Sequence, residues 1–225
     1  MDPSNDVRII ESWRRNATPW TSAVRNNAIE SRVLVTNQAI IDAVLSRAPS
    51  SVLDIGCGEG WLVRALAERG IRGTGVDVVP ALIAHAQHRG GGDFHVASYE
   101  QLASGMLRST SDVAVANFSL IGRESVDQLV RCVPELLVPR GTLIVQTLHP
   151  VIACGDLRYE DGWREGSWSG FGDAFSDPAP WYFRTMESWV ALFVHSGFRL
   201  VELREPLHPT SRRPASAIFI AEATG

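Results

Sequence analysis

The stretch VLDIGCGEG at residues 52–60 decides the fold that this sequence is expected to adopt. A short apolar, strand-like run leads directly into glycines at 56, 58 and 60, and the helical run WLVRALAERG follows at 61–70. Glycine allows a tight turn and a close approach of a ligand to the backbone, while the free N–H groups of the next helix face the same point. We therefore expect a ligand-binding turn between a strand and a helix.

An acidic residue ends the next strand-like run, GTGVDVV at 73–79. Asp77 lies 21 residues after Gly56. A carboxylate in this place can accept hydrogen bonds from both hydroxyls of an unmodified ribose. The glycine turn and Asp77 together predict a site for a cofactor that contains adenosine.

Two side chains in the turn argue against a dinucleotide. The fingerprint G-x-G-x-x-G needs its third glycine for close helix packing, with the helix N-terminus facing a pyrophosphate. Trp61 stands at that third position. Asp54, two residues before Gly56, would repel a pyrophosphate but suits the cationic amino-acid end of a cofactor.

The run D-x-G-x-G-x-G resembles motif I of the class I S-adenosylmethionine-dependent methyltransferases, and the similarity extends over roughly residues 32 to 223. The resemblance implies S-adenosylmethionine as cofactor and a Rossmann-like α/β fold. This fold has a seven-stranded, mostly parallel sheet, helices on both faces and an antiparallel C-terminal strand pair. The cofactor contacts that it implies are Trp20, Arg32, Asp54, Gly56, Cys57, Gly58, Asp77, Val78, Ala97, Ser98, Tyr99, Asn117 and Phe118.

Two of these positions depart from the simplest pattern or allow another interpretation. The adenine-side segment commonly carries an acid, but Ala97 and Ser98 stand there, so a hydroxyl or a backbone carbonyl must accept from the base. Arg32 lies where related small-molecule methyltransferases place an arginine against the cofactor carboxylate, which a guanidinium fork matches. The alternative for Arg32 is a solvated arginine at the start of a helix.

The rest of the chain fits one α/β domain over residues 1–225. Strand-like runs alternate with helical ones, which is typical of βαβ units around a parallel sheet. A helix is expected from about Arg32, with Val33, Ile40 and Val44 sharing its buried face. The expected strands are 52–56, 73–79, 94–98, 112–118 and 142–148, followed by an antiparallel pair within 198–206 and 215–223.

Two aromatic-rich segments are predicted to form lids. Residues 1–31 form an N-terminal helical lid, in which Trp13 and Trp20 flank the helix-breaking stretch NATP; we expect this segment to become ordered over bound ligand. Residues 150–184 form a second, Gly-, Pro- and aromatic-rich lid, because long ordered loops are usually functional. A small satellite core under a long loop is the alternative for the second lid.

The candidate catalytic residues are His149, in the TLHP stretch after the fifth strand, and Tyr182, in the second lid. His149 lies at the carboxyl edge of the sheet, where it could act as a general base or serve only as a hydrogen-bonded elbow before Pro150. The strand-four exit reads Asn117-Phe118-Ser119-Leu120 rather than Asn-Pro-Pro-aromatic, so nucleic-acid bases are poor acceptor candidates. No metal site is expected.

Composition and charge argue against a nucleic-acid or membrane partner. The net charge of -4 provides no sequence-wide attraction to nucleic acid or to anionic lipid. The three cysteines are widely spaced, and no apolar run is long enough for a membrane helix, so we expect a cytoplasmic protein without a membrane or nucleic-acid partner. The oligomeric state cannot be read from the sequence.

The expected activity is in-line methyl transfer from S-adenosylmethionine to a small-molecule acceptor. Two alternatives share the cofactor. A cyclase on the same fold would close the methionine part into a four-membered azetidine ring and release methylthioadenosine, and a non-catalytic module would only bind the ligand.

Overall fold

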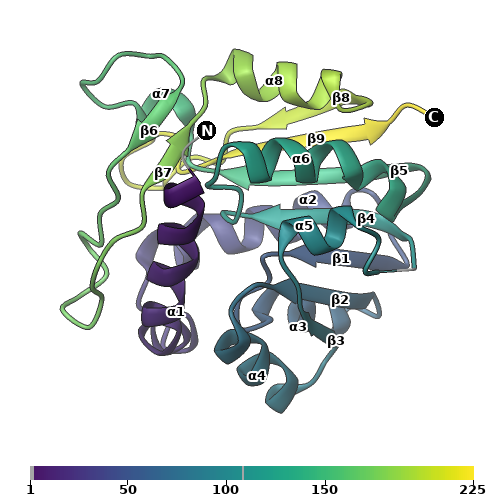
Figure 1. Ribbon diagram of the computed structural model, residues 1–225, viewed down its shortest axis with the longest axis horizontal. Coiled ribbons are helices and arrows are strands. Elements are labelled where there is room, and N and C mark those ends of the chain that lie inside the picture. The colour runs from purple at the N-terminus through teal and green to yellow at the C-terminus, as the bar shows by residue number, and fades with distance from the viewer. Residues whose placement is uncertain (1–2, 108) are drawn as a thin grey trace.

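A computed structural model, which describes residues 3–107 and 109–225, contains the expected seven-stranded sheet (Figure 1). The strand order is β3-β2-β1-β4-β5-β9-β8, and β9 alone runs antiparallel to its neighbours. This confirms the Rossmann-like α/β fold and the antiparallel closing pair. The strands are β1 (Ser51–Ile55), β2 (Arg72–Asp77), β3 (Asp93–Val96), β4 (Ser111–Asn117), β5 (Leu137–Thr147), β8 (Phe198–Arg204) and β9 (Ala217–Ala223).

Helices cover both faces of the sheet. On one face, α2 (Asn37–Leu45) and α3 (Trp61–Ala67) bury Ile40, Val44, Leu62 and Leu66 against the strands. On the other face lie α5 (Tyr99–Ala103), α6 (Glu124–Cys132) and α8 (Met186–His195). The central strands β1, β4 and β9 and the second half of β5 are covered on both sides, and their residues form nearly continuous apolar runs. This is why these strands could be predicted from the sequence.

The chain reverses its direction of winding between β1 and β4, which are neighbours in the sheet. In open α/β sheets this switch point, at the carboxyl ends of the strands, is where ligands bind. Figure 1 shows α1 (Pro3–Arg25) and the hairpin of β6 (Gly162–Arg164) and β7 (Trp181–Phe183) next to each other at this edge. Both segments that the sequence predicted as lids therefore border the switch point.

The N-terminal helix differs from the sequence expectation in one respect. The NATP stretch does not break it, because α1 continues through Pro19 to Arg25. Pro19 removes one backbone donor, and the packing of Ala17, Trp13 and Trp20 against α4 (Pro80–Arg89) and the residues just before it stabilises the helix on both sides of the proline. Within the described ranges no helix, α1 included, is long and apolar enough to cross a membrane.

The helix expected near Arg32 contains one turn of π-helix, Arg32–Thr36, directly before α2 begins at Asn37. A π-turn holds more residues than an α-turn, so the side chains are rotated around the helix axis. Val33, which was expected on the buried face, is 49% exposed. Ile40 and Val44 are buried as expected. Single π-turns occur often at functional sites, and this one positions Arg32 toward the switch point.

Candidate active site

The glycine turn connects β1 to α3 and tolerates no side chain at two of its positions. Gly56 has φ +76°, and a Cβ there would lie 2.3 Å from the Cβ of Ser119. Gly60 caps α3 in the left-handed region, and its Cβ would lie 2.7 Å from the ring of Phe94. Gly58 borders a different group, the indole nitrogen of Trp20. The three glycines thus bring the backbone, the end of β4 and the N-terminal helix together.

Asp77 ends β2 directly beside this turn. Its carboxylate accepts hydrogen bonds from the amides of Gly58 and Val79, each at 2.9 Å. Burial raises the pKa of Asp77, and the backbone hydrogen bonds oppose that rise. Each carboxylate oxygen keeps a second lone pair, so the group can also accept from the two hydroxyls of a ribose in the cavity that it lines with Val78.

A small recess beside the turn contains charges of opposite sign. Buried Arg32 and Asp54 both line it, together with Asn117 and with Cys57 of the turn. In the part of the chain that the structure describes, the Nη2 atom of Arg32 and the Oδ1 atoms of Asp54 and Asn117 are buried without a hydrogen-bond partner. Leaving such groups unpaired costs about 1–3 kcal/mol each, and more for charged groups. A ligand with both a carboxylate and an ammonium would supply the missing partners.

Burial in the recess shifts the pKa values of Asp54 and Arg32 in opposite directions. Burial raises the pKa of Asp54 to about 8; the carboxylate of Asp77 adds to the rise, and Arg32 opposes it. Burial also lowers the pKa of Arg32 to about 10, so the guanidinium stays charged near neutral pH. It lies between two indoles, 5.2 Å from the ring centroid of Trp20 and 4.9 Å from that of Trp61. The sequence suggested Trp61 only as an obstacle to dinucleotides, not as a wall of this recess.

The adenine-side positions lie at the start of α5. Ser98 lines the cavity and caps the helix, its hydroxyl accepting from the amide of Gln101. Tyr99 also lines the cavity and donates to the carbonyl of Ser119 at 2.9 Å. Ala97 is buried and is not among the residues that line the cavity; its amide donates to the carbonyl of Asp77. Ser98 and Tyr99, but not Ala97, thus present side chains to a ligand.

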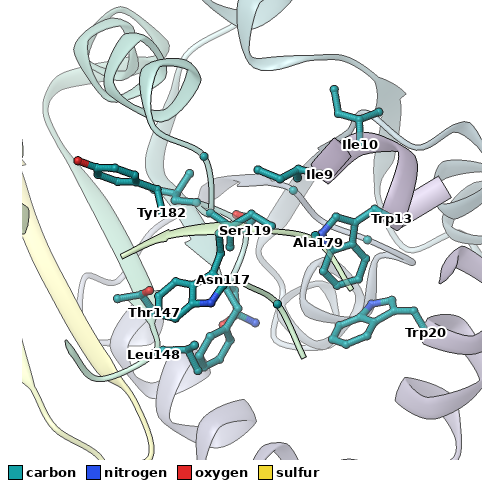
Figure 2. Close-up of a pocket in the computed structure, with 18 of the residues that line it drawn as sticks. Ile9, Ile10, Trp13, Trp20, Asn117, Ser119, Thr147, Leu148, Ala179 and Tyr182 are labelled. Atoms are coloured by element: carbon teal, nitrogen blue, oxygen red, sulfur yellow. The ribbon is translucent and has the colours of Figure 1, made fainter. Parts of the chain in front are cut away.

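Phe118, at the exit of β4, has a left-handed backbone with φ +56°. A bulky residue with positive φ is an uncommon, strained conformation that the surroundings must stabilise. Here the amide of Phe118 donates to the carbonyl of Gln146 on β5. Asn117, Phe118 and Ser119 all line the cavity, and Figure 2 shows Asn117 and Ser119 across from Trp13 and Trp20 of α1.

The two candidate catalytic residues lie differently. His149 is buried, and its Nε2 atom lies 2.6 Å from Oε1 of Glu205; its neighbours Leu148 and Pro150 line the cavity but His149 does not. This placement favours His149 as a hydrogen-bonded residue in the elbow before Pro150 over His149 as a general base. Tyr182 does line the cavity, but Figure 2 shows its hydroxyl directed away from Asn117 and the tryptophans. Its ring lies under the guanidinium groups of Arg123 and Arg184.

Beyond the recess, the cavity has a volume of about 430 Å³ and largely apolar walls. One wall is the inner face of α1, with Ile9, Ile10 and Trp13, and the opposite wall includes Leu148 (Figure 2). Further aromatic side chains come from the 150–184 segment and α8: Trp168, Phe171, Trp181, Tyr182, Phe183 and Trp189. A flat apolar molecule would fit these walls, because ring faces and edges bury area with little loss of side-chain entropy.

The two segments predicted to be lids are joined by several polar contacts. Asn16 of α1 donates from Nδ2 to the carbonyl of Ser176, at 2.7 Å, and accepts from the amide of Ser176, at 3.0 Å. Ser12 donates to the carbonyl of Asp177, and Arg15 forms an ion pair of 2.6 Å with its carboxylate. These residues fix α1 and the tip of the long loop to each other.

An aromatic cluster continues the same contact toward the cavity. Trp13 packs edge-on against Trp20 and Trp168, with ring centroids 5.1 and 5.5 Å apart. Phe171 stacks on Trp20 at 6.3 Å, and Phe175 packs on Trp168 at 4.9 Å. We call this cluster, with the polar contact, the aromatic clamp. It closes over the same cavity that Asp77 and the glycine turn line.

Comparisons with known proteins agree with this geometry. A family model described as a methyltransferase domain matches residues 31–203. The chain is 23% identical over 212 residues to an uncharacterized protein of Haemophilus influenzae, covering 82% of this chain and 81% of that one. It is 32% identical over 114 residues to the ubiquinone biosynthesis O-methyltransferase of Xanthomonas oryzae, a match that spans about half of each chain (48% and 47%).

A solved structure of a plantazolicin methyltransferase, in complex with a triazolic desmethyl analogue and S-adenosylhomocysteine, superposes with a TM-score of 0.67 at 16% identity. The alignment covers 99% of this chain and 97% of that one, and it shows that the whole described fold is shared. The chain therefore belongs to the methyltransferase-domain family and shares its fold with solved S-adenosylmethionine-dependent methyltransferases.

Proposed function

We propose that the protein transfers the methyl group of S-adenosylmethionine to a small acceptor with a flat, largely apolar body. One observation carries this proposal: a charge-paired recess and an aromatic-walled cavity share Arg32, Gly56 and Asn117 in their walls. The recess suits the amino-acid end of the cofactor. The cavity has room for an acceptor next to it.

The buried, unpaired atoms of the recess support a specific placement of the cofactor. Arg32 would hold the carboxylate of the methionine part through its free Nη2, and Asp54 and Asn117 would accept from its ammonium. Asp77 would hold the ribose hydroxyls. Ser98 and Tyr99 would border the adenine, and Phe118, Val78 and Trp20 would supply apolar contacts.

When bound, S-adenosylmethionine supplies a methyl group on a positively charged sulfur, which leaves as a neutral thioether. The main tasks of the protein are then to align the acceptor and to exclude water. The left-handed turn at Phe118 and the stretch from Thr147 to Pro150 shape the acceptor side of the cavity. The aromatic clamp covers it, with Trp13 and Trp20 packed edge to face.

The names of two similar proteins are consistent with a small organic acceptor. One acts in ubiquinone biosynthesis, and the other is named for plantazolicin. Neither name refers to a nucleic acid. For this chain, the apolar walls of its own cavity support such an acceptor.

Replacing Asp77 with alanine is expected to weaken the binding of S-adenosylhomocysteine by about 1–3 kcal/mol, because a charged acceptor for two hydroxyls is lost. Calorimetry on the wild type and the variant measures this difference. Asp93→Ala is the matched control, since it removes an exposed carboxylate from the neighbouring strand, at the amino end of the sheet. The melting temperature should be recorded as well, because Asp77 also accepts from Gly58 and Val79. An unchanged dissociation constant for Asp77→Ala would mean that the ribose is held elsewhere.

A further inference from the structure

Asp6, in the first turns of α1, borders the cavity at the end opposite the recess. Trp20, on the same helix, stands at the recess end, and 14 residues of α-helix separate the two by about 21 Å. The residues around Asp6 come from the exit of β4 and the start of α6, namely Gly122 and Ser125. Asp6 therefore lies away from the recess that suits the amino-acid end of the cofactor, and an acceptor in the rest of the cavity can reach it.

The surrounding structure makes room for this carboxyl group. Gly122 leaves space beside this carboxyl group, since a Cβ there would lie only 2.7 Å from Oδ1 of Asp6 and 2.6 Å from Oγ of Ser125. Oδ1 is buried and has no hydrogen-bond partner among the described residues, although the Ser125 hydroxyl lies close enough to lower the pKa of the carboxyl group. A buried acceptor atom without a donor is costly. A donor on a bound molecule would remove that cost.

The charges around Asp6 favour a positively charged donor. Glu100 also lines the cavity, and Glu124 lies near enough to act on Asp6. The nearby cation Arg184 is already engaged: it donates to the carbonyls of Gly122 and Arg123 and pairs with Asp127 at 2.8 Å. Burial raises the pKa of Asp6, and Ser125 and Arg184 oppose the rise while Glu124 and Glu100 add to it.

A cation in the cavity would also meet ring faces, which attract positive charge. The walls between Asp6 and the recess are apolar, with Ile9, Trp13 and Leu120 among them. We propose that Asp6 is a specificity-determining residue that selects acceptors with an ammonium group on a flat apolar body. This inference rests on the proposed function, because it names the acceptor class of the same site.

The test compares pairs of probes that differ in charge but hardly in shape. Tryptamine, 2-naphthylmethylamine and benzylamine are ammonium ions at pH 7.5, and tryptophol, 2-naphthalenemethanol and benzyl alcohol are their neutral partners. Calorimetry measures their binding to the full-length protein, with and without S-adenosylhomocysteine. The variants are Asp6→Asn, which keeps the shape and removes the charge, and Glu11→Gln, which makes the same change at an exposed position on the same helix.

We expect at least one amine to bind the wild type about tenfold or more tightly than its alcohol, the size of effect that a charged hydrogen bond gives. Asp6→Asn should lose that preference while the alcohol binds as before, and Glu11→Gln should keep it. Equal binding of amine and alcohol, binding of none of the amines, or an equal loss of both in Asp6→Asn would overturn the proposal.

The same titrations separate this inference from the proposed function. Failure of the wild type to bind S-adenosylhomocysteine would contradict the proposed cofactor site. The charge preference is measured without that ligand as well, so it supports or overturns the role of Asp6 in either case.

Discussion

Removal of residues 1–20 is expected to reduce turnover of S-adenosylmethionine by about 100-fold or more, because an open site admits water and misaligns the acceptor. The deletion takes away Asp6, Trp13 and Trp20, which line the cavity, and the α1 half of the aromatic clamp. The sheet and the helices that cover its two faces lose none of their residues. The truncated protein should therefore remain folded.

The cost in stability should be modest by comparison. The deleted part of α1 packs on Val79 and Leu82 through Ala17 and its tryptophans, a small satellite of the main core. For a domain of this size each kcal/mol lowers the melting temperature by about 2–4 °C. Thermal unfolding and product formation are measured on the same preparation. Asn16→Ala, which breaks only the paired contact with Ser176, should lower the turnover and the melting temperature by less than the deletion does.

Hydrogen exchange tests whether the segment closes over ligand. Residues 10–30 should exchange more slowly when S-adenosylmethionine is present, because the clamp is expected to form over the bound cofactor. If their protection is the same with and without ligand, or if the truncated protein turns over normally, the segment is ordinary scaffold and the lid proposal fails.

The affinity for S-adenosylhomocysteine is expected to rise by about tenfold per pH unit between pH 6 and pH 8 and then to level off. The reason is Asp54, whose pKa is raised to about 8 by burial and by Asp77, against the opposing charge of Arg32. Below that pKa the group is a neutral acid, whereas the ammonium of the ligand prefers the carboxylate. Binding must therefore release a proton, and it does so at less cost as the pH rises.

Two titratable groups beside Asp54, the Cys57 thiol and the Arg32 guanidinium, keep the same charge throughout this pH range. Burial and the nearby carboxylates raise the pKa of the Cys57 thiol, which stays neutral in this range, and Arg32 stays charged. Calorimetry at pH 7 in buffers of different ionisation enthalpy should count close to one proton released per ligand bound. Asp54→Asn should release none and should show a flat affinity between pH 6 and 8. A wild type without proton release would show that Asp54 does not meet the ammonium.

Much of the fold could be predicted because its signals are local. Strands covered on both faces are apolar throughout, and the glycines at 56 and 60 are dictated by positive φ and by close neighbours. The effect of Pro19 was misjudged because its helix is held by tertiary packing that overrides local propensity. Likewise, Arg32 lies between Trp20 and Trp61, which are far from each other in the sequence, so no local pattern indicated the π-turn there.

The acceptor side of the site could not be read for a different reason. It is assembled from segments far apart in the chain, and nothing local indicates that α1 meets the loop around Ser176. One signal was present: Asp6, Ile9, Trp13, Ala17 and Trp20 recur every three or four residues, the spacing of one helix face. A carboxylate at the end of an otherwise apolar face was the sequence feature that could have identified Asp6.

Product analysis by mass spectrometry tests the central claim most directly. The purified protein is incubated with S-adenosylmethionine and the three amines used as probes above, and every adenosine-containing species is identified. Methyl transfer predicts S-adenosylhomocysteine together with an amine heavier by one methyl group. Methylthioadenosine would indicate cyclisation or lysis of the cofactor instead, and fully intact S-adenosylmethionine would indicate binding alone; either result would contradict methyl transfer to an amine.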